Sequence, residues 1–386
     1  MPPESRKPLL IHSNSYDDAS MLHASGFLAT DPFTYLETNG HRVILTSALE
    51  AGRARKQSRA TAIREMDEFG IQNLVRETKS WDEAYAAALD RFLAEYGVRD
   101  ALVPREFPLY LAELLRAHGV HLEVAPELAE QRRRKTDDEV AAIEETQRAS
   151  EAGFDAAVRM LREADIARDG SLVLGGKPLT AERVLAEIEV TMLGRGCVAD
   201  DTIAAGGPQA ADPHQVGNGP YRVNEAIVID IYPQSRRTRY FADMTRTVCR
   251  GEPPEEIVRM YDMTLRAQQE GIAMVRAGVT GREIHERIED LYFEAGYGTT
   301  RDGQRRPGVP SFIHGLGHGV GLAIHEAPAV GRSGVQPLEP GDVITIEPGL
   351  YQEGLGGVRL EDMLVVTEMG ARNLTRAPKV LRLDSR

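Results

Sequence analysis

The chain has 386 residues, of which 42% are hydrophobic and 27% are charged, proportions typical of a globular protein with room for two domains. Its net charge of -13 argues against general nucleic-acid binding, because a phosphate backbone would be repelled. No apolar run is long enough to cross a bilayer, and the first ten residues lack the apolar core of a secretory leader. Two cysteines cannot build a disulfide framework, which favours a reducing cytoplasm. Together these features predict a cytoplasmic protein without nucleic-acid or membrane partners.

The N-terminal third of the chain alternates between strand and helix patterns, which predicts a small α/β domain. Its five histidines are scattered, and we expect structural roles for them rather than catalysis: His12, His23, His41, His118 and His121. The predicted strands and helices in chain order are 7–12, 41–46, 80–98 (helix), 100–104, 107–119 (helix, ended by Gly119) and 120–126.

We place the domain boundary after residue 134, giving domains 1–134 and 135–386. Arg132 to Lys135 form a basic run, which is typical of a solvated connection. Thr136 followed by Glu139 predicts a capping box, from which a long amphipathic helix begins.

The predicted elements of the second domain occur twice, each time as a long helix, a second helix and a group of strands. This pattern suggests two similar halves about a pseudo-twofold axis, with any site at their seam drawing side chains from both. The first half has helices from 136 and at 180–196 and strands near 225–233 and 239–251; the second has helices at 253–278 and 280–296 and strands near 320–328, 342–351 and 357–370.

Four acidic residues stand within or beside the apolar strand patterns of this domain: Asp230, Asp243, Glu347 and Glu361. A buried unpaired carboxylate costs several kcal/mol, so each acid must be exposed, paired or bound to a cation. Any one alone is explained by an edge strand or a salt bridge. Four together, near a histidine cluster, point to a site for two divalent ions.

The histidine cluster is "FIHGLGHGVGLAIHEAP", residues 312–328, which holds three of the ten histidines and four glycines. Glycine is unfavourable inside strands and helices, so this density indicates close approaches of the backbone. If the segment were a strand, His314 and His318 would share one face.

The stretches "DIYPQSRRTRYFADMTRT", "HGLGHGVGLAIHEAP", "ITIEPGLY" and "GVRLED" resemble the motifs of the pita-bread metallopeptidases, in the branch of Xaa-Pro dipeptidases (prolidases) and aminopeptidase P. The resemblance covers roughly residues 135–386. It implies an α+β pita-bread catalytic domain with a pseudo-twofold internal repeat, preceded by a creatinase-like α/β domain.

The resemblance also implies a complete ligand set for two divalent ions, in which two of the acids bridge the pair. Mn²⁺ is the first choice, and Co²⁺, Zn²⁺ and Fe²⁺ are alternatives that the donor set permits. One departure is that the first two ligands are about two residues further apart than the family pattern, which we interpret as a longer hairpin loop at 233–239. The implied ligands are Asp230, Asp243, His318, Glu347 and Glu361, of which Asp243 and Glu361 match the bridging acids.

Further residues match the substrate side of the family's site. Glu347 is expected to transfer the proton, and His325 or His214 to donate a hydrogen bond to the scissile carbonyl, which a hydroxide bridging the ions would attack. His314 is expected beside the metal or the substrate, with a hydrogen-bonded core histidine as the alternative. Arg359 and Tyr351 have counterparts in the family, Arg359 as the partner of a ligand carboxylate.

The predicted activity is therefore that of an Xaa-Pro dipeptidase, acting on dipeptides or short proline-containing peptides, and the family commonly forms homodimers. The alternatives are an aminopeptidase P, which releases the first residue of longer Xaa-Pro peptides, and a small-molecule amidohydrolase on the same scaffold. A non-catalytic binding protein would require broken ligands or a basic surface, and the sequence has neither.

Overall fold

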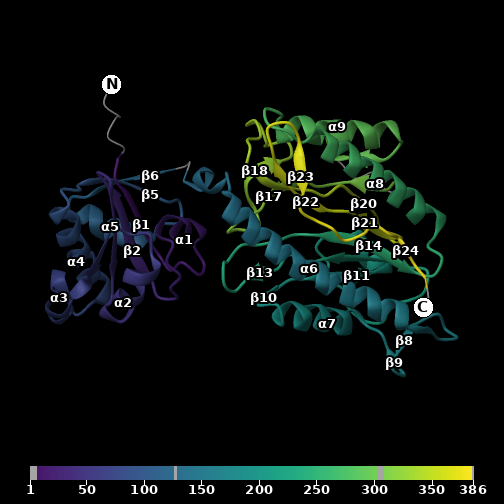
Figure 1. Ribbon diagram of the computed structural model, residues 1–386, viewed down its shortest axis with the longest axis horizontal. Coiled ribbons are helices and arrows are strands. Elements are labelled where there is room, and N and C mark those ends of the chain that lie inside the picture. Colours follow the sequence, from purple (N-terminus) through teal and green to yellow (C-terminus); the bar gives the residue numbers. More distant parts are fainter. Residues whose placement is uncertain (1–6, 126–127, 303–307, 385–386) are drawn as a thin grey trace. The chain divides into compact units, whose positions relative to one another are not determined.

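The structure, a computed structural model, describes residues 7–125, 128–302 and 308–384. The chain divides into two compact units, the first ending at Arg132 and the second beginning at Arg133 (Figure 1). Within these described ranges, no helix is both long and apolar enough to cross a bilayer. Each unit has its own buried core.

The first unit is a six-stranded mixed sheet with helices packed against it, in the strand order β4-β3-β2-β1-β5-β6. Strands β1, β2 and β3 are antiparallel neighbours, whereas β4, β5 and β6 each pair in parallel. The α/β alternation predicted from the sequence is therefore confirmed. The elements are β1 (Leu9–Ser13), α1 (Ala19–Ser25), β2 (Phe33–Thr38), β3 (His41–Thr46), α2 (Ala48–Gln57), β4 (Ala62–Glu65), α3 (Ile71–Thr78), α4 (Trp81–Glu95), β5 (Asp100–Val103), α5 (Leu109–Ala117) and β6 (His121–Val124).

The second unit contains the expected repeat of two helices followed by strands, which pair mostly antiparallel. In the first half, α6 and α7 precede the sheet β11-β12-β14-β24. The elements are α6 (Asp137–Glu163), β7 (Asp165–Ile166), β8 (Leu172–Leu174), β9 (Lys177–Pro178), α7 (Ala181–Leu193), β10 (Cys197–Val198), β11 (Ile203–Gly206), β12 (Ala226–Asp230), β13 (Gln234–Ser235), β14 (Thr245–Arg250) and the late strand β24 (Arg382–Leu383).

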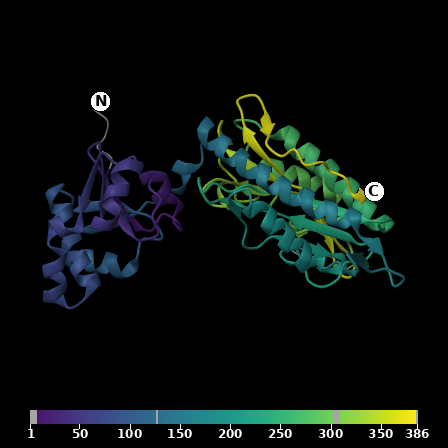
Figure 2. The same cartoon turned by 60° about the horizontal axis from the view of Figure 1, so that its bottom comes forward.

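In the second half, α8 and α9 precede the sheets β18-β17-β19-β22-β23 and β15-β16-β20-β21. In Figure 2, helices of this unit lie on either side of the strands. The elements are α8 (Glu255–Met274), α9 (Gly281–Glu294), β15 (Gly298–Thr299), β16 (Ser311–Phe312), β17 (Gly317–Gly319), β18 (Glu326–Val330), β19 (Val343–Ile346), β20 (Gly349–Gln352), β21 (Gly356–Arg359), β22 (Asp362–Val366) and β23 (Ala371–Asn373).

The start of the second unit departs from the sequence prediction. The capping box is present, since Thr136 Oγ1 accepts from the backbone of Glu139 and Glu139 Oε2 accepts from that of Thr136. The basic run before it, however, is not wholly solvated: Arg133 is 4% and Lys135 8% exposed, whereas Arg134 between them is exposed. This alternation follows from extended pairing of Arg134 with Asp342, which turns its two neighbours inward.

The predicted strand at 320–328 is interrupted. Strand β17 ends at Gly319, which pairs with Glu326 at the start of β18, and residues 320–325 form a loop between them. His325 lies at the end of this loop, whereas His318 lies on β17.

Candidate active site

The acidic residues singled out in the sequence all lie at or near strand ends of the second unit. Asp230 is the last residue of β12, Glu347 directly follows β19, and Glu361 lies between β21 and β22. Asp243 lies two residues before β14. The two halves meet here, because the backbone N–H of Glu361 donates to the carbonyl of Thr245 on β14 at 3.0 Å.

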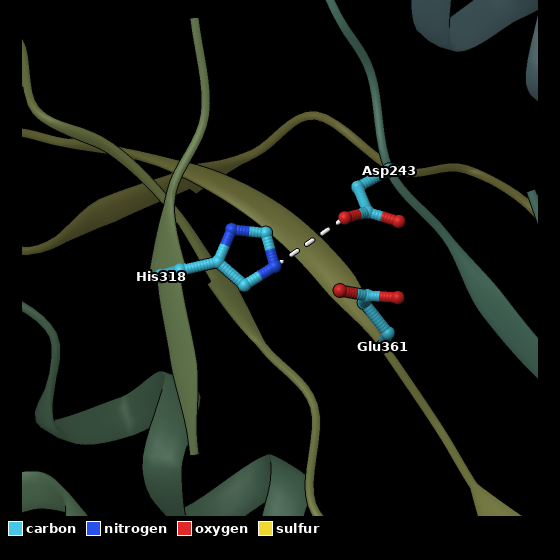
Figure 3. A group of neighbouring side chains, drawn as sticks. All are labelled: Asp243, His318 and Glu361. Atoms are coloured by element: carbon cyan, nitrogen blue, oxygen red, sulfur yellow. Dashed lines mark ion pairs between the residues drawn. The ribbon is translucent and has the colours of Figure 1, made fainter. Parts of the chain in front are cut away.

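His318 stands among these carboxylates. Its Nε2 atom lies 3.4 Å from Asp243 Oδ2 and 3.5 Å from Glu347 Oε1. One ligand atom each from Asp243, His318 and Glu361 lie within 4.8 Å of one another. Figure 3 shows the arrangement of the three side chains. The side chains come from three separate segments of chain, and they face a common point.

Burial and mutual repulsion make these carboxylates hard to ionise together. Burial, together with the charges of neighbouring acids, holds the pKa values of Asp243 and Glu361 well above their usual range. Burial also raises the pKa of Glu347 to about 8, with the charge of Asp230 adding to the effect and Arg359 opposing it. Such a cluster either retains protons or holds cations, which remove the repulsion.

The hydrogen bonding of His318 favours bound cations over retained protons. Its Nδ1 atom lies 3.1 Å from the carbonyl oxygen of Gly319, which can only accept, so Nδ1 carries the proton. Burial lowers the pKa of His318 to about 4, so the ring is neutral and Nε2 presents a lone pair. A lone pair facing two ionised carboxylates is unfavourable unless a cation lies between them. The carbonyl behind the ring is the usual partner of a metal-binding histidine.

Asp230 points to the same conclusion. Its Oδ2 atom accepts from Arg359 Nη2 at 2.6 Å, while its buried Oδ1 atom has no hydrogen-bond partner among the described residues. Arg359 is 3% exposed and also donates to Thr245 Oγ1 at 3.1 Å. Thr245 in turn donates to Glu361 Oε2 at 2.8 Å. The donor set of four acids and one neutral imidazole therefore fits divalent metal ions.

His314 is satisfied within the chain. Its Nδ1 atom donates to the carbonyl of Gly315 at 2.7 Å, so its Nε2 atom accepts from the hydroxyl of Tyr351 at 2.9 Å. The Tyr351 oxygen then accepts from Arg359 Nη1 at 3.0 Å. Burial lowers the pKa of His314 to about 3. Because both ring nitrogens are engaged, this geometry favours the hydrogen-bonded alternative for His314 over a substrate contact.

His325 and His214 are the two exposed histidines of the site. The His325 ring lies edge-on to His318, with 4.3 Å between centroids. Burial and the neighbouring His214 lower the pKa of His325. His214 lies on the loop before β12, where its backbone N–H donates to Asp212. All the site residues predicted from the sequence, with the exception of Tyr351 behind His314, line one cavity of about 700 Å³.

Several residues of the site were missed by the sequence reasoning. Tyr232 lines the cavity and donates to the carbonyl of Asp201 at 2.7 Å. Thr245 links two site residues, and the fully buried Arg246 donates to the carbonyl of Glu361 at 2.6 Å and to Asp362 at 2.8 Å. Tyr232 and Thr245 each stand two residues after a predicted ligand, so the period of two along a strand was the available signal.

The longer spacing between Asp230 and Asp243 forms a turn. Gln234 and Phe241 form an antiparallel bridge, and within it the backbone of Ser235 donates to Tyr240 at 3.0 Å. Arg239 adopts a φ of 65° in this turn. The extra residues thus lie outside the cluster of carboxylates.

A repeated helix-and-sheet unit with carboxylates gathered at its seam defines the pita-bread class of metallopeptidases. The profile of metallopeptidase family M24 matches residues 141–368, more than half of the chain. The protein belongs to this family, which implies divalent metal ions at the site.

Individual relatives are named as enzymes of the prolidase and aminopeptidase P branch. The chain is 33% identical over 249 residues to the "Xaa-Pro dipeptidase" of Pyrococcus furiosus, covering 64% of each protein, slightly less than two thirds of that relative. The solved "Prolidase from Pyrococcus horikoshii OT3" is 26% identical with a TM-score of 0.78, covering 97% of this chain and 95% of that one. The "X-Pro aminopeptidase from Thermotoga maritima MSB8" is 26% identical with a TM-score of 0.77, over 97% and 95%.

Proposed function

We propose that this protein is an Xaa-Pro dipeptidase, which hydrolyses the bond between the first residue and proline. The observation that carries the proposal is the convergence of four carboxylates and the neutral His318 on one cavity. The names of the relatives from Pyrococcus support the substrate class. The N-terminal unit, proposed as a creatinase-like domain of residues 1–134, lies outside the matched region.

We propose two divalent ions, Mn²⁺ first, at this site. When bound, such ions supply Lewis acidity for the scissile carbonyl and lower the pKa of the attacking water. The residues that would hold them are Asp230, Asp243, His318, Glu347 and Glu361.

The protein's own residues divide the remaining work. Glu347, at the cavity and next to His318 Nε2, takes the proton of the attacking water on a carboxylate oxygen and returns it to the proline nitrogen. That return matters because the nitrogen of a tertiary amide leaves poorly until it is protonated. His325 and His214 face the same cavity and donate hydrogen bonds to the carbonyl oxygen as charge develops on it. Arg359 holds Asp230, and His314 with Tyr351 holds Arg359.

The proposal is tested with Mn²⁺-loaded protein on Leu-Pro and Leu-Pro-Pro, side by side. Cleavage of the dipeptide alone is the expected result. Efficient release of leucine from the tripeptide would instead make the protein an aminopeptidase P. The similarity to the Thermotoga maritima enzyme supports this alternative. Cleavage of neither peptide would remove the peptidase proposal and leave a small-molecule substrate.

The variant Glu347→Gln separates metal binding from proton transfer. It retains an oxygen at the same place, so part of the metal should stay bound while turnover is abolished. Full activity in this variant would overturn the role of Glu347.

The assembly and setting of the protein are also proposals. We propose a homodimer in a reducing cytoplasm, which agrees with Cys197 and Cys249 both being free. Sedimentation of the purified protein tests the dimer, and metal analysis of protein purified without added metal tests the preference for Mn²⁺.

A further inference from the structure

A buried ion pair lies at the base of the loop that carries His325, and the chemistry above does not use it. Lys135 Nζ lies 2.7 Å from Glu326 Oε1, and the two side chains are 2% and 1% exposed. Glu326 directly follows His325 and opens β18. Lys135 comes from the basic run that the sequence analysis interpreted as a solvated connection.

The ion pair is locked to the backbone on both sides. Lys135 Nζ also donates to the carbonyl of Arg133 at 3.0 Å, and Glu326 Oε2 accepts from the N–H of Ala323 at 3.2 Å. Gly321 lies directly under the pair: a Cβ there would be 2.3 Å from Glu326 Oε1 and 2.9 Å from Lys135 Cε. The pair therefore packs against the loop backbone with no intervening side chain.

The other side of the loop faces the proposed metal ligands. The carbonyl of Gly321 accepts from the N–H of Phe241 at 2.8 Å, two residues before Asp243. The His325 ring meets the His318 ring at 4.3 Å. A shift of the loop would thus move His325 relative to both ligands.

Stability alone does not require charged residues at this place. Apolar side chains of similar volume commonly replace a buried ion pair without loss of stability, whereas directional contacts fix the position of a neighbouring group. We propose that Lys135 and Glu326 are positioning residues, whose ion pair holds the loop 320–325 so that His325 meets the substrate carbonyl. This inference rests on the proposed dipeptidase function.

The first test is Lys135→Met, which keeps the length of the side chain and removes its charge. Because His325 acts on the transition state, kcat for Leu-Pro should fall by roughly tenfold to a hundredfold while KM changes little. In a His325→Ala background, Lys135→Met should cause no further loss, since residues that act through one another are not additive. An equal loss in both backgrounds would overturn the proposal.

Arg133→Met is the matched control. It breaks the neighbouring buried ion pair, with Asp342, on the same segment of chain, where the Arg133 side chain binds Asp342, Gln336 and the carbonyl of Pro337 rather than Glu326. Its kcat should stay near that of the wild type. A fall equal to that of Lys135→Met would mean general loosening of the segment and would refute positioning.

A double variant keeps the test decisive if Lys135→Met does not fold. Lys135→Met with Glu326→Leu replaces the whole pair by apolar groups, so folding should recover while kcat stays low. A stable double variant with the kcat of the wild type would sink the proposal.

The last readout does not depend on activity. In histidine-labelled protein loaded with diamagnetic Zn²⁺, the ring signal of His325, assigned by its loss in His325→Ala, should shift or broaden in Lys135→Met while metal content per chain stays the same. An unchanged signal, or loss of the metal, would refute positioning. If the wild type cleaves neither peptide, the proposed function fails, yet this measurement still decides whether the ion pair places His325.

Discussion

Replacing individual glycines in the segment 314–321 would have different structural costs. At Gly317, an added Cβ would lie 2.1 Å from the carbonyl oxygen of Thr345. This clash could be relieved only by moving the backbone. At Gly315, the nearest atom would be 3.6 Å away, which is ordinary contact. Gly317 precedes His318, whose N–H donates to Thr345 Oγ1 at 3.1 Å. Close approach of two strands at the ligand is therefore what requires glycine here.

We expect Gly317→Ala to destabilise the protein by about 1–3 kcal/mol, because the methyl group overpacks a fixed backbone. It should also lower metal content, since His318 moves with its neighbour. Gly315→Ala is the control and should change the free energy of unfolding far less. Chemical denaturation with metal analysis measures both effects, and equal stability of the two variants would contradict this account.

His12 makes the stability of the first unit depend on pH. Its Nδ1 lies 2.9 Å from Thr34 Oγ1 and 3.2 Å from the hydroxyl of Tyr85, and burial lowers the pKa of His12 to about 4. The unfolded chain takes up a proton near pH 6.5, whereas the folded chain resists it until about pH 4. Stability is therefore fully present above pH 6.5 and is lost as the pH falls through this window.

The expected loss between pH 6.5 and pH 4 is about 3 kcal/mol, from 1.36 kcal/mol per pKa unit. His12→Gln removes this group, so the free energy of unfolding should depend less on pH across the same window. Denaturation curves at several pH values compare the two slopes. Parallel slopes would show that His12 is not the group responsible.

At the scale of elements, strand ends bring the catalytic candidates together, and a short extended segment packs beside β19. Arg134 forms an antiparallel bridge with Asp342 just before β19, so Arg133 and Lys135 turn inward to Asp342 and Glu326. Asp342 is fully buried and accepts two hydrogen bonds from Arg133, at 2.7 and 2.6 Å. This arrangement ties the beginning of the unit to the turn before β19.

Arg133→Met should destabilise the protein by about 3–5 kcal/mol, because it leaves the Asp342 carboxylate buried without its partner. Adding Asp342→Asn should recover much of that loss, since the uncompensated charge is removed. Urea denaturation of both variants measures the difference. A single variant as stable as the wild type would show that Asp342 finds another partner.

The strand patterns singled out the four acids, because each stands within or beside an apolar run, a local signal with a clear cost, whereas the proposed ligand set with His318 came from the resemblance to the family. The sequence could not predict that Lys135 is buried, since its partner Glu326 is 191 residues away and only the fold brings them together. The loop position of His325 was missed for a similar reason: "VGLAIHEAP" has the composition of a strand, yet close packing at Gly319 and Gly321 bends it. Arg246 was missed because an arginine within a strand carries no local sign of its partners.

At the scale of the whole molecule, the two units place different demands on solution conditions. The first has its own hydrophobic core and no part in the acidic cluster as the structure describes it. The second concentrates four carboxylates in one cavity, and burial raises the pKa values of Asp243, Glu347 and Glu361. Divalent cations relieve that repulsion only in the folded state, so they stabilise the second unit alone.

We therefore expect chelation to lower the unfolding temperature of the second unit and to leave the first unchanged. With metal at a thousand times its Kd, binding contributes about 4 kcal/mol, which corresponds to roughly 8–16 °C for a domain of this size. Scanning calorimetry with and without chelator measures the shift, and His12→Gln marks the transition of the first unit at low pH. Glu361→Gln is the control, in which the shift should shrink because one ligand is gone. Equal shifts in both transitions would mean that the two units unfold together, and no shift at all would contradict metal binding by the acidic cluster.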